Sequence, residues 1–366
     1  MTGGAPSARR RAPLIAVAAA STLGTLLLLE CAVRVRDGRL LDLDHRIVED
    51  RGRWSGDYAA HDPDVGWIPR PGIRVRGEAL GWQPEAARAE PGVGGNAAVT
   101  ILLDGLRSNG ETGDLPAHPV ALAVGDSFTF GDQVSDAATW PAVLERLLKT
   151  RVLNAGVFAY GLDQSVLRAE QLAPRFSPDL LIVSFIPVDV RRTTVSARAK
   201  ATKPYFDVVD KRLVLRNRPV PPPEEDMDAF RRVFGYSHLA DMLMNRIDPA
   251  YWQAGPVERA HDRGLSVSCL LMERLRRLGD ARQMPVLVVA QPSKRGDLDT
   301  RVSDIVLGCA RDAGLAALDL FPAFRGVRDE NPERYQRFFF GHMTPSGNRF
   351  VARQMAASIR RNGLLD

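Results

Sequence analysis

The chain has 366 residues, of which 45% are hydrophobic and 25% charged, and this composition argues against a largely disordered protein. Its net charge of +5 comes from scattered arginines without a recognised binding motif, so we expect no nucleic-acid partner. The three cysteines, Cys31, Cys269 and Cys309, form no CxxC pair, which argues against a structural zinc site.

The N-terminus predicts a membrane anchor. The basic cluster Arg9–Arg11 precedes an apolar run over Ala12–Leu29, and a run of roughly 18 residues just suffices to span a bilayer. This cluster favours a cytoplasmic N-terminus and an exported body, although Arg34 and Arg36 weaken the asymmetry of charge. The alternative is a cleaved signal peptide, since Ala18–Ala20 resembles a cleavage site. We favour the anchor, because cleavage there would leave four leucines at the mature end.

Three regions follow from the composition along the chain. Residues 1–35 are expected to form a cytoplasmic tip and the transmembrane anchor. Residues 36–115, rich in Gly, Pro and Arg, are expected to form an irregular lead-in packed on the main domain. Residues 116–366 are expected to form that domain, with an insertion at about 191–255.

The main domain shows short apolar runs that alternate with longer amphipathic stretches, which is typical of βαβ units and a parallel sheet. We therefore predict an α/β fold: a three-layer α/β/α domain of the flavodoxin-like kind with five parallel strands, preceded by the transmembrane helix. The predicted strands are Val120–Val124, Arg151–Asn154, Leu180–Phe185, Val286–Ala290 and Leu315–Leu320. The predicted helices are Ala137–Leu148, Gln164–Leu172, Ser268–Leu278, Val302–Ala313 and Ser346–Arg360.

The insertion interrupts this alternation between the third strand and the helix near Ser268. Within it, Tyr205–Val209 and Arg212–Leu215 flank Asp210 and Lys211 in the manner of a β-hairpin. A proline-rich spacer and the acidic residues 224–226 follow, without a motif that indicates a function.

Residues that directly follow the strands are the first candidates for chemistry, since ligands bind at the carboxyl ends of parallel strands. The first strand ends in Gly125, Asp126 and Ser127. Ser127 has the character of a nucleophile presented on a turn, which needs a base such as histidine. The structural alternative is that Asp126 and Ser127 only cap the next helix.

Four stretches of the chain share a pattern with one enzyme family. They are VALAVGDSFTFGDQV, VLNAGVFAYGLDQ, SPDLLIVSFIPVDV and FGHMTPSG, in chain order. These stretches resemble the conserved blocks of the GDSL/SGNH hydrolases. The lead-in stretches HDPDVGWIPRPG and GLRSNGE and the insertion stretch KPYFDVVDKRLVL are similar to segments of membrane-anchored bacterial members. The resemblance implies an ester hydrolase with Ser127 as nucleophile and His342, on a loop before the last helix, as general base.

The oxyanion-binding positions of the family are altered here. The family glycine that contributes a backbone N–H aligns with Ala159, or with Gly161 if the loop shifts, and either residue still supplies a backbone N–H. The family asparagine aligns with Val188, which cannot donate a hydrogen bond, and such a loss typically costs about 10²–10³ in rate. Asn154 and Gln164 are candidate substitutes for the missing amide.

The carboxylate that orients the histidine is also missing. The family aspartate lies two or three residues before the histidine, where this chain has Phe340 and Phe339. Its role is to fix the imidazole tautomer and to stabilise the imidazolium. Candidate replacements are Asp189, Asp319, Asp329 and Glu330, each of which is also explained as a helix cap or a solvated loop residue.

The leading hypothesis is a membrane-anchored, single-pass serine hydrolase with an extracytoplasmic body, acting on acyl or acetyl esters of an envelope glycan or lipid. An O-acyltransferase would use the same residues. The alternative of a different class is a degenerate domain that binds an acylated ligand or an envelope-assembly partner. No metal or organic cofactor is required. An exported body would permit a disulfide between Cys269 and Cys309, but two buried free thiols are the simpler interpretation.

Overall fold

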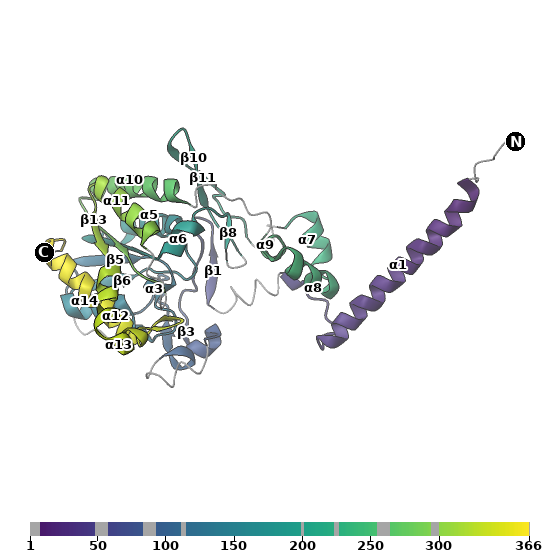
Figure 1. Cartoon of the computed structure of the whole chain (residues 1–366), viewed down its shortest axis with the longest axis horizontal. Coiled ribbons are helices and arrows are strands. Elements are labelled where there is room, and N and C mark those ends of the chain that lie inside the picture. Colours follow the sequence, from purple (N-terminus) through teal and green to yellow (C-terminus); the bar gives the residue numbers. More distant parts are fainter. Residues whose placement is uncertain are drawn as a thin grey trace.

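The computed structural model describes residues 8–47, 58–82, 93–110, 115–198, 201–222, 227–254, 264–293 and 300–365. A single long helix, α1 (Ala8–Arg36), extends away from the body, and the C-terminus lies on the far side of that body (Figure 1). Within the segment Ile15–Arg36, an 18-residue stretch has a mean hydropathy of 1.8 and contains no residue buried within the molecule. It is therefore long and apolar enough to cross a membrane, as a transmembrane or signal helix must be.

A five-stranded parallel sheet forms the centre of the body. Its strands are β5 (Val120–Val124), β6 (Arg151–Asn154), β7 (Leu180–Phe185), β12 (Val286–Ala290) and β13 (Ala316–Asp319). They lie in the order β13-β12-β7-β5-β6, and every neighbouring pair is parallel. This is the flavodoxin-like order, in which the chain reverses its direction of winding between the first and third strands, here β5 and β7. The fold class predicted from the sequence is confirmed.

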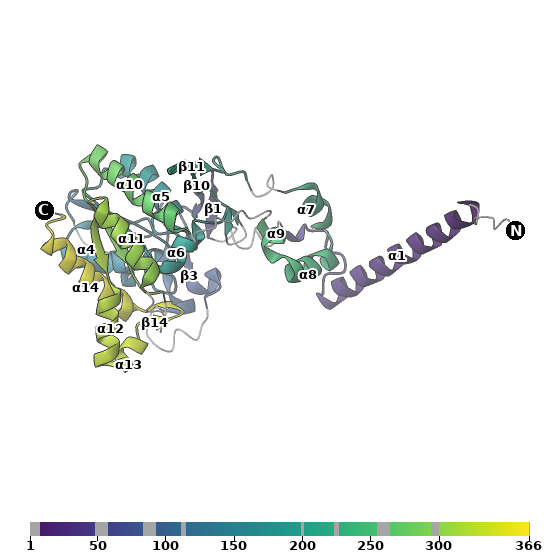
Figure 2. The same ribbon diagram turned by 45° about the horizontal axis from the view of Figure 1, so that its top comes forward.

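The two faces of the sheet are covered by helices, which completes the three layers. One face packs against α5 (Leu162–Phe176), α10 (Leu265–Arg282) and α11 (Arg301–Asp312). The opposite face packs against α4 (Trp140–Leu148), α12 (Phe321–Glu330) and α14 (Pro345–Arg361). Figure 2 shows α10 and α11 on one side of the sheet and α14 on the other. Because both faces are covered, the central strands β5, β7 and β12 are buried at every position, and all of their residues except Ser184 are apolar.

The predicted helices are all present, with shifted ends. α4 begins at Trp140, because Asp136–Ala138 form a separate 3₁₀ turn and the hydroxyl of Thr139 caps α4 by accepting from the backbone N–H of Ala142. α5, by contrast, extends beyond its predicted range at both ends. Short elements complete the body: α3 (Ser127–Phe130), α6 (Pro187–Arg192), α13 (Pro332–Gln336), β14 (Phe339–Phe340) and β15 (His342–Met343).

The lead-in contains regular structure that the sequence did not indicate. It forms two small antiparallel ribbons, of which one pairs β1 (Ala59–Asp62) with β2 (Gly66–Pro69) and the other pairs β3 (Arg74–Arg76) with β4 (Ala98–Thr100). Trp67, in β2, is buried in the core of the main domain. Its indole N–H donates to the carbonyl of Phe158, 3.0 Å away. The lead-in therefore supports the loop that follows β6.

The insertion contains the predicted hairpin, formed by β10 (Tyr205–Val209) and β11 (Arg212–Arg216). Asp210 and Lys211 have φ values of 49° and 58°, as a tight two-residue turn requires. The pair β8 (Ala197–Arg198) and β9 (Ala201–Thr202), and three helices that the sequence analysis did not predict, complete the insertion. The helices are α7 (Ala229–Phe234), α8 (His238–Ile247) and α9 (Pro249–Ala254). The acidic residues 224–226 lie outside the described residues.

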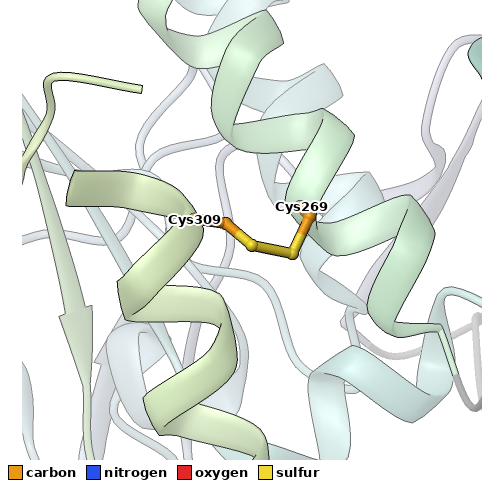
Figure 3. Close-up of a disulfide and its surroundings, with 2 residues drawn as sticks. All are labelled: Cys269 and Cys309. Atoms are coloured by element: carbon orange, nitrogen blue, oxygen red, sulfur yellow. A yellow bond between two sulfur atoms is a disulfide. The ribbon is translucent and has the colours of Figure 1, made fainter. Parts of the chain in front are cut away.

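The interpretation of Cys269 and Cys309 as buried free thiols is wrong. Cys269 on α10 and Cys309 on α11 form a disulfide, which joins two neighbouring helices on the same face of the sheet (Figure 3). Their Cα atoms are 5.2 Å apart, within the normal range for a disulfide. The sequence could not show this contact, because it depends on how α10 packs against α11.

Candidate active site

Ser127 lies at the carboxyl end of β5, at the switch point of the sheet. The strand leaves through Gly125, where a Cβ atom would lie 2.2 Å from the hydroxyl of Thr129, so only glycine fits. Asp126 caps the short helix α3, and its Oδ1 accepts from the backbone N–H of Phe128 at 2.9 Å. The capping alternative is therefore correct for Asp126, whereas the hydroxyl of Ser127 makes only a long contact of 3.5 Å with Oδ2 of Asp126 and has a closer partner.

That partner is His342, whose Nε2 lies 3.0 Å from Oγ of Ser127. His342 stands at the start of β15 in a two-strand ribbon, not on an open loop as the sequence suggested. Its backbone N–H donates to the side-chain oxygen of Gln133 at 2.9 Å, which fixes the ribbon against the turn after α3. Burial lowers the pKa of His342, so the imidazole is neutral near pH 7 and Nε2 is able to accept the serine proton.

At the two positions where the resemblance implies backbone oxyanion donors, Ser127 and Ala159, the N–H group makes no hydrogen bond within the described residues. Ala159 has a φ of 63°, and within the described residues its N–H makes no hydrogen bond. The N–H of Gly161 instead donates to the side chain of Gln164 at 3.2 Å. Ser127 is the first residue of α3, where a helix leaves N–H groups without an intrahelical acceptor. Of the two aligned loop positions, Ala159 therefore retains the available donor.

The residues considered as substitutes for the missing amide are engaged elsewhere. Asn154 donates to the carbonyl of Phe130 and accepts from the N–H of Gly156, so it fixes the loop after β6. Gln164 donates to the carbonyl of Val65 in the lead-in. Val188 lies on α6 and lines the same cavity as His342. A side chain without a donor therefore stands at this wall of the site.

The candidate carboxylates do not reach the free side of the histidine ring. Phe340 lies directly across the ribbon from His342. Asp319 accepts from the backbone N–H of Phe321, where α12 begins, and Asp189 accepts from the backbone N–H of Ile186. Asp329 lies at the end of α12, ion-paired with its neighbour Arg328, and the adjacent Glu330 is exposed. Nδ1 of His342 makes no hydrogen bond within the described residues.

Arg192, which the sequence analysis missed, lies at the centre of the site. It follows Val188 by one turn of α6 and lines the same cavity. Its Nη1 donates to Asp189 at 2.6 Å and to the carbonyl of Tyr160, next to Ala159, at 2.8 Å. Nη1 also lies 3.6 Å from Asp126. Nη2 has no hydrogen-bond partner among the described residues.

Two buried carboxyl groups flank this guanidinium. Burial raises the pKa of Asp126 and, more strongly, of Asp189, and the charge of Asp126 raises that of Asp189 further. One cation between two carboxyl groups favours a state in which they share a proton. In that state the pair carries one negative charge, which balances the charge of Arg192 and holds its guanidinium in place.

Asp132 is a second charged residue that the sequence analysis missed. Its Oδ2 lies 3.7 Å from Nε2 of His342, on the side of the ring that faces Ser127. Its Oδ1 is buried without a hydrogen-bond partner among the described residues. Burial raises the pKa of Asp132 to about 7, against the opposing charges of Arg107 and Arg192. Its position after the glycine that ends α3 was visible in the sequence, but its proximity to the histidine was not.

A cavity of about 700 Å³ opens beside His342, within the usual size of a small-molecule site. Phe128, Ile186 and Val188 contribute apolar walls, while Arg191 and Arg301 contribute positive charge. Among the described residues, no group of three or more His, Cys, Asp or Glu side chains could hold a metal ion.

By sequence, no known protein family and no curated protein matches the chain. Among solved structures, it is similar to a lipase/acylhydrolase from Enterococcus faecalis, with 13% identity, a TM-score of 0.39, and coverage of 68% of this chain and 98% of that one. A GDSL-like lipase from Bacteroides thetaiotaomicron is similar at 10% identity and a TM-score of 0.36, covering 67% and 89%. A catalytic mutant of Axe2, an acetylxylan esterase from Geobacillus stearothermophilus, is similar at 14% identity and a TM-score of 0.38, covering 66% and 94%. Because fold does not determine function, we derive the activity from the site itself.

Proposed function

We propose that the protein is a serine hydrolase of the SGNH/GDSL type that cleaves carboxylic esters. The observation that carries this proposal is the 3.0 Å contact between Oγ of Ser127 and Nε2 of His342 beside an open cavity. A purely structural serine would not need a neutral, partly buried histidine at hydrogen-bond distance.

The first half of the reaction is acyl transfer to the enzyme. Oγ of Ser127 attacks the acyl carbon while its proton passes to Nε2 of His342. The tetrahedral intermediate then expels the alcohol, which takes the proton back from Nε2. In the second half, water attacks the acyl carbon and gives a proton to Nε2, and the acid then leaves as Oγ of Ser127 takes that proton back from Nε2. A glycan hydroxyl in place of this water would make the same site an acyltransferase.

Negative charge on the acyl oxygen is stabilised by three donors in this proposal. The backbone N–H groups of Ser127 and Ala159 supply two of them. Arg192 supplies the third in place of the amide missing at Val188, because Nη2 is free and the residue lines the cavity. A charged donor forms stronger hydrogen bonds to an oxyanion than a neutral amide does.

Asp132 has a supporting role in the same mechanism. When Nε2 of His342 takes the serine proton, the imidazolium gains a carboxylate 3.7 Å away. This contact compensates in part for the aspartate missing at Phe340. It acts at Nε2, so it does not fix the ring tautomer through Nδ1, and we expect a slower enzyme than one with a complete triad.

The substrate that fits these features is an acyl or acetyl ester of an envelope glycan or lipid. The cavity has apolar walls for a short acyl group and arginines for an anionic neighbour of the ester. The disulfide between Cys269 and Cys309 supports an exported body, since disulfides persist in oxidising compartments. In this proposal α1 remains uncleaved and anchors that body outside the membrane.

The degenerate binding domain remains the second candidate. It is favoured by two specific features, the lack of an amide at Val188 and the free Nδ1 of His342. In that case the cavity would hold an acylated ligand without turnover.

A fluorophosphonate probe separates the two candidates. Full-length protein in detergent should be labelled at Ser127, and Ser127→Ala should not be labelled. Ser135→Ala, a change outside the cavity, should be labelled like the wild type. A folded wild-type protein that does not react would contradict the hydrolase and leave the binding domain.

A further inference from the structure

The C-terminal part of α1 is joined to the insertion by the partly buried carboxylate of Glu30. Glu30 accepts hydrogen bonds from the backbone N–H groups of His238 and Leu239, at 2.9 and 2.8 Å, and from the hydroxyl of Ser237 at 2.7 Å. These are the free groups of the first turn of α8, so Glu30 caps that helix from another element. Arg34 adds a hydrogen bond to the carbonyl of Tyr236 at 2.8 Å.

Glu30 also marks where the apolar part of α1 ends. It follows the run Ala12–Leu29 directly, and 18 helical residues extend about 27 Å, close to the hydrocarbon thickness of a bilayer. If α1 spans the membrane, Glu30 lies at the boundary between hydrocarbon and headgroups. The start of α8 then lies at the same depth, because Glu30 holds it there.

The helices beside this boundary expose apolar side chains. On α7, Phe230, Val233 and Phe234 follow helical spacing and are 44%, 65% and 46% exposed. On α8, Leu243 and Ile247 are one turn apart and are 43% and 73% exposed. Figures 1 and 2 both show α7 and α8 beside the end of α1 that faces the body.

The segment between α1 and the body adds to this surface. Leu40, Leu41 and Leu43 are 53%, 89% and 81% exposed. Together with the five side chains of α7 and α8, they make up most of the large apolar residues exposed outside α1 in the described part of the chain. Such a concentration on a soluble surface is unfavourable unless something covers it.

We propose that α7, α8 and residues 40–43 form a membrane-binding surface that inserts into the headgroup region of the bilayer spanned by α1. Phospholipid is the occupant that fits, because the surface lies at the depth where α1 leaves the hydrocarbon. Arg246 is exposed on α8 beside Ile247 and suits the phosphate of a headgroup. The body is then held at a fixed height above the membrane. This inference rests on the proposed anchor.

Spin labels on the full-length protein test the membrane anchor and the membrane-binding surface separately. The background is Cys31→Ala, which removes the exposed free cysteine and leaves the disulfide intact. Single labels are placed through Phe234→Cys and Ile247→Cys on the surface, Leu26→Cys in the anchor, and Leu103→Cys as a control that is 89% exposed on the body. The protein is reconstituted in phosphatidylcholine–phosphatidylglycerol vesicles, and collisions with oxygen and with a water-soluble nickel complex are measured.

We expect the label at Leu26 to be shielded from nickel and exposed to oxygen. Labels at Phe234 and Ile247 should show nickel collision rates at least about threefold below that at Leu103, as insertion of 5–10 Å into the interface requires. If Leu26 behaves as expected but the two surface labels match Leu103, the membrane-binding surface is wrong and the anchor stands. If Leu26 is open to nickel, the anchor itself is wrong. Spin–spin broadening at Phe234 would identify a second copy as the occupant and overturn the proposal.

Discussion

The two halves of the candidate site differ in how many of the residues implied by the sequence resemblance they contain. The half built on β5, α3 and the loop after β6 retains Ser127 and the free N–H of Ala159. The half built on α6 and the β14–β15 ribbon retains His342 but has Val188 and Phe340 where the resemblance implies an amide and a carboxylate.

This difference shows which roles tolerate substitution. A backbone N–H survives the change from glycine to alanine, because every residue except proline carries one. A side-chain donor or carboxylate is lost outright when valine or phenylalanine replaces it. In the proposed mechanism the altered half therefore depends on charged residues from nearby positions, and Arg192 and Asp132 occupy such positions.

The largest effect is expected from removing His342, the proposed general base, which contacts Ser127 in the other half of the site. His342→Ala should lower kcat for p-nitrophenyl acetate by about 10³-fold, since proton transfer by a positioned base contributes about that much. His118→Ala is the matched control, because His118 is exposed and pairs with Asp179 instead. Equal activity in wild type and His342→Ala would show that the contact with Ser127 has no catalytic role.

Replacing the proposed oxyanion donor should have the next largest effect. Arg192→Gln should lower kcat by about 10²-fold with little change in KM, because the donor acts only as charge develops on the acyl oxygen. Arg216→Gln, a change at an exposed arginine on β11 outside the cavity, should stay near the wild type.

Arg192 also bridges Asp126 and Asp189, so the Arg192→Gln change removes a structural contact as well as the proposed oxyanion donor. The double variant Arg192→Gln, Val188→Asn separates the two roles. Partial recovery of kcat at an unchanged melting temperature supports an oxyanion donor. A lowered melting temperature without recovery would reduce Arg192 to a structural residue.

Restoring the amide in the altered half should produce a gain. Val188→Asn alone should raise kcat about tenfold, less than the 10²–10³ of a fully positioned donor, because the surroundings are adapted to valine. The gain should vanish when Ser127→Ala is added. A folded Val188→Asn protein without any gain would contradict the alignment of this position or the esterase assignment.

The smallest expected effect is on the pH dependence of activity, through Asp132. Activity should rise first as His342 loses its proton, below its usual pKa of 6.5, and again near pH 7 as Asp132 ionises. Asp132→Asn should abolish the second rise and lower activity at pH 8 by about threefold, the effect of one partly screened ion pair. A profile that keeps both rises would exclude Asp132 from the mechanism.

The pH dependence of thermal stability gives an independent check on the raised pKa of Asp132. Its pKa is higher in the folded protein than in the unfolded chain, so the buried carboxyl favours folding while protonated. This contribution is lost as pH rises from about 4 through 7. Asp132→Asn should therefore melt with a weaker dependence on pH over that range, which thermal unfolding at several pH values would show.

The sequence by itself determined the sheet. Four of the five predicted strands match the structure to the residue, and the fifth, β13, is shorter by one residue at each end. In uninterrupted apolar runs such as Val120–Val124 and Val286–Ala290, the side chains on both faces of the strand are apolar. Such strands are buried on both faces only between two layers of helices. The hairpin at Asp210 and Lys211 was equally local, since its turn is encoded by two adjacent residues.

The sequence also indicated the pair Ser127 and His342, because both lie in blocks that resemble one family. The 3.0 Å distance between Oγ of Ser127 and Nε2 of His342 depends on the tertiary structure, which brings the ribbon before α14 to the carboxyl end of β5.

Only the tertiary structure decided which charged residues surround this pair. Arg192 and Asp132 lie in different segments, and neither position has a local pattern that sets it apart from an ordinary surface charge. The same holds for the disulfide between α10 and α11 and for the cap that Glu30 provides to α8, which joins residues about 200 positions apart. Contacts of this kind depend on how completed elements pack, because hydrogen bonds and ion pairs act over a few ångströms and periodicity along the chain does not report them.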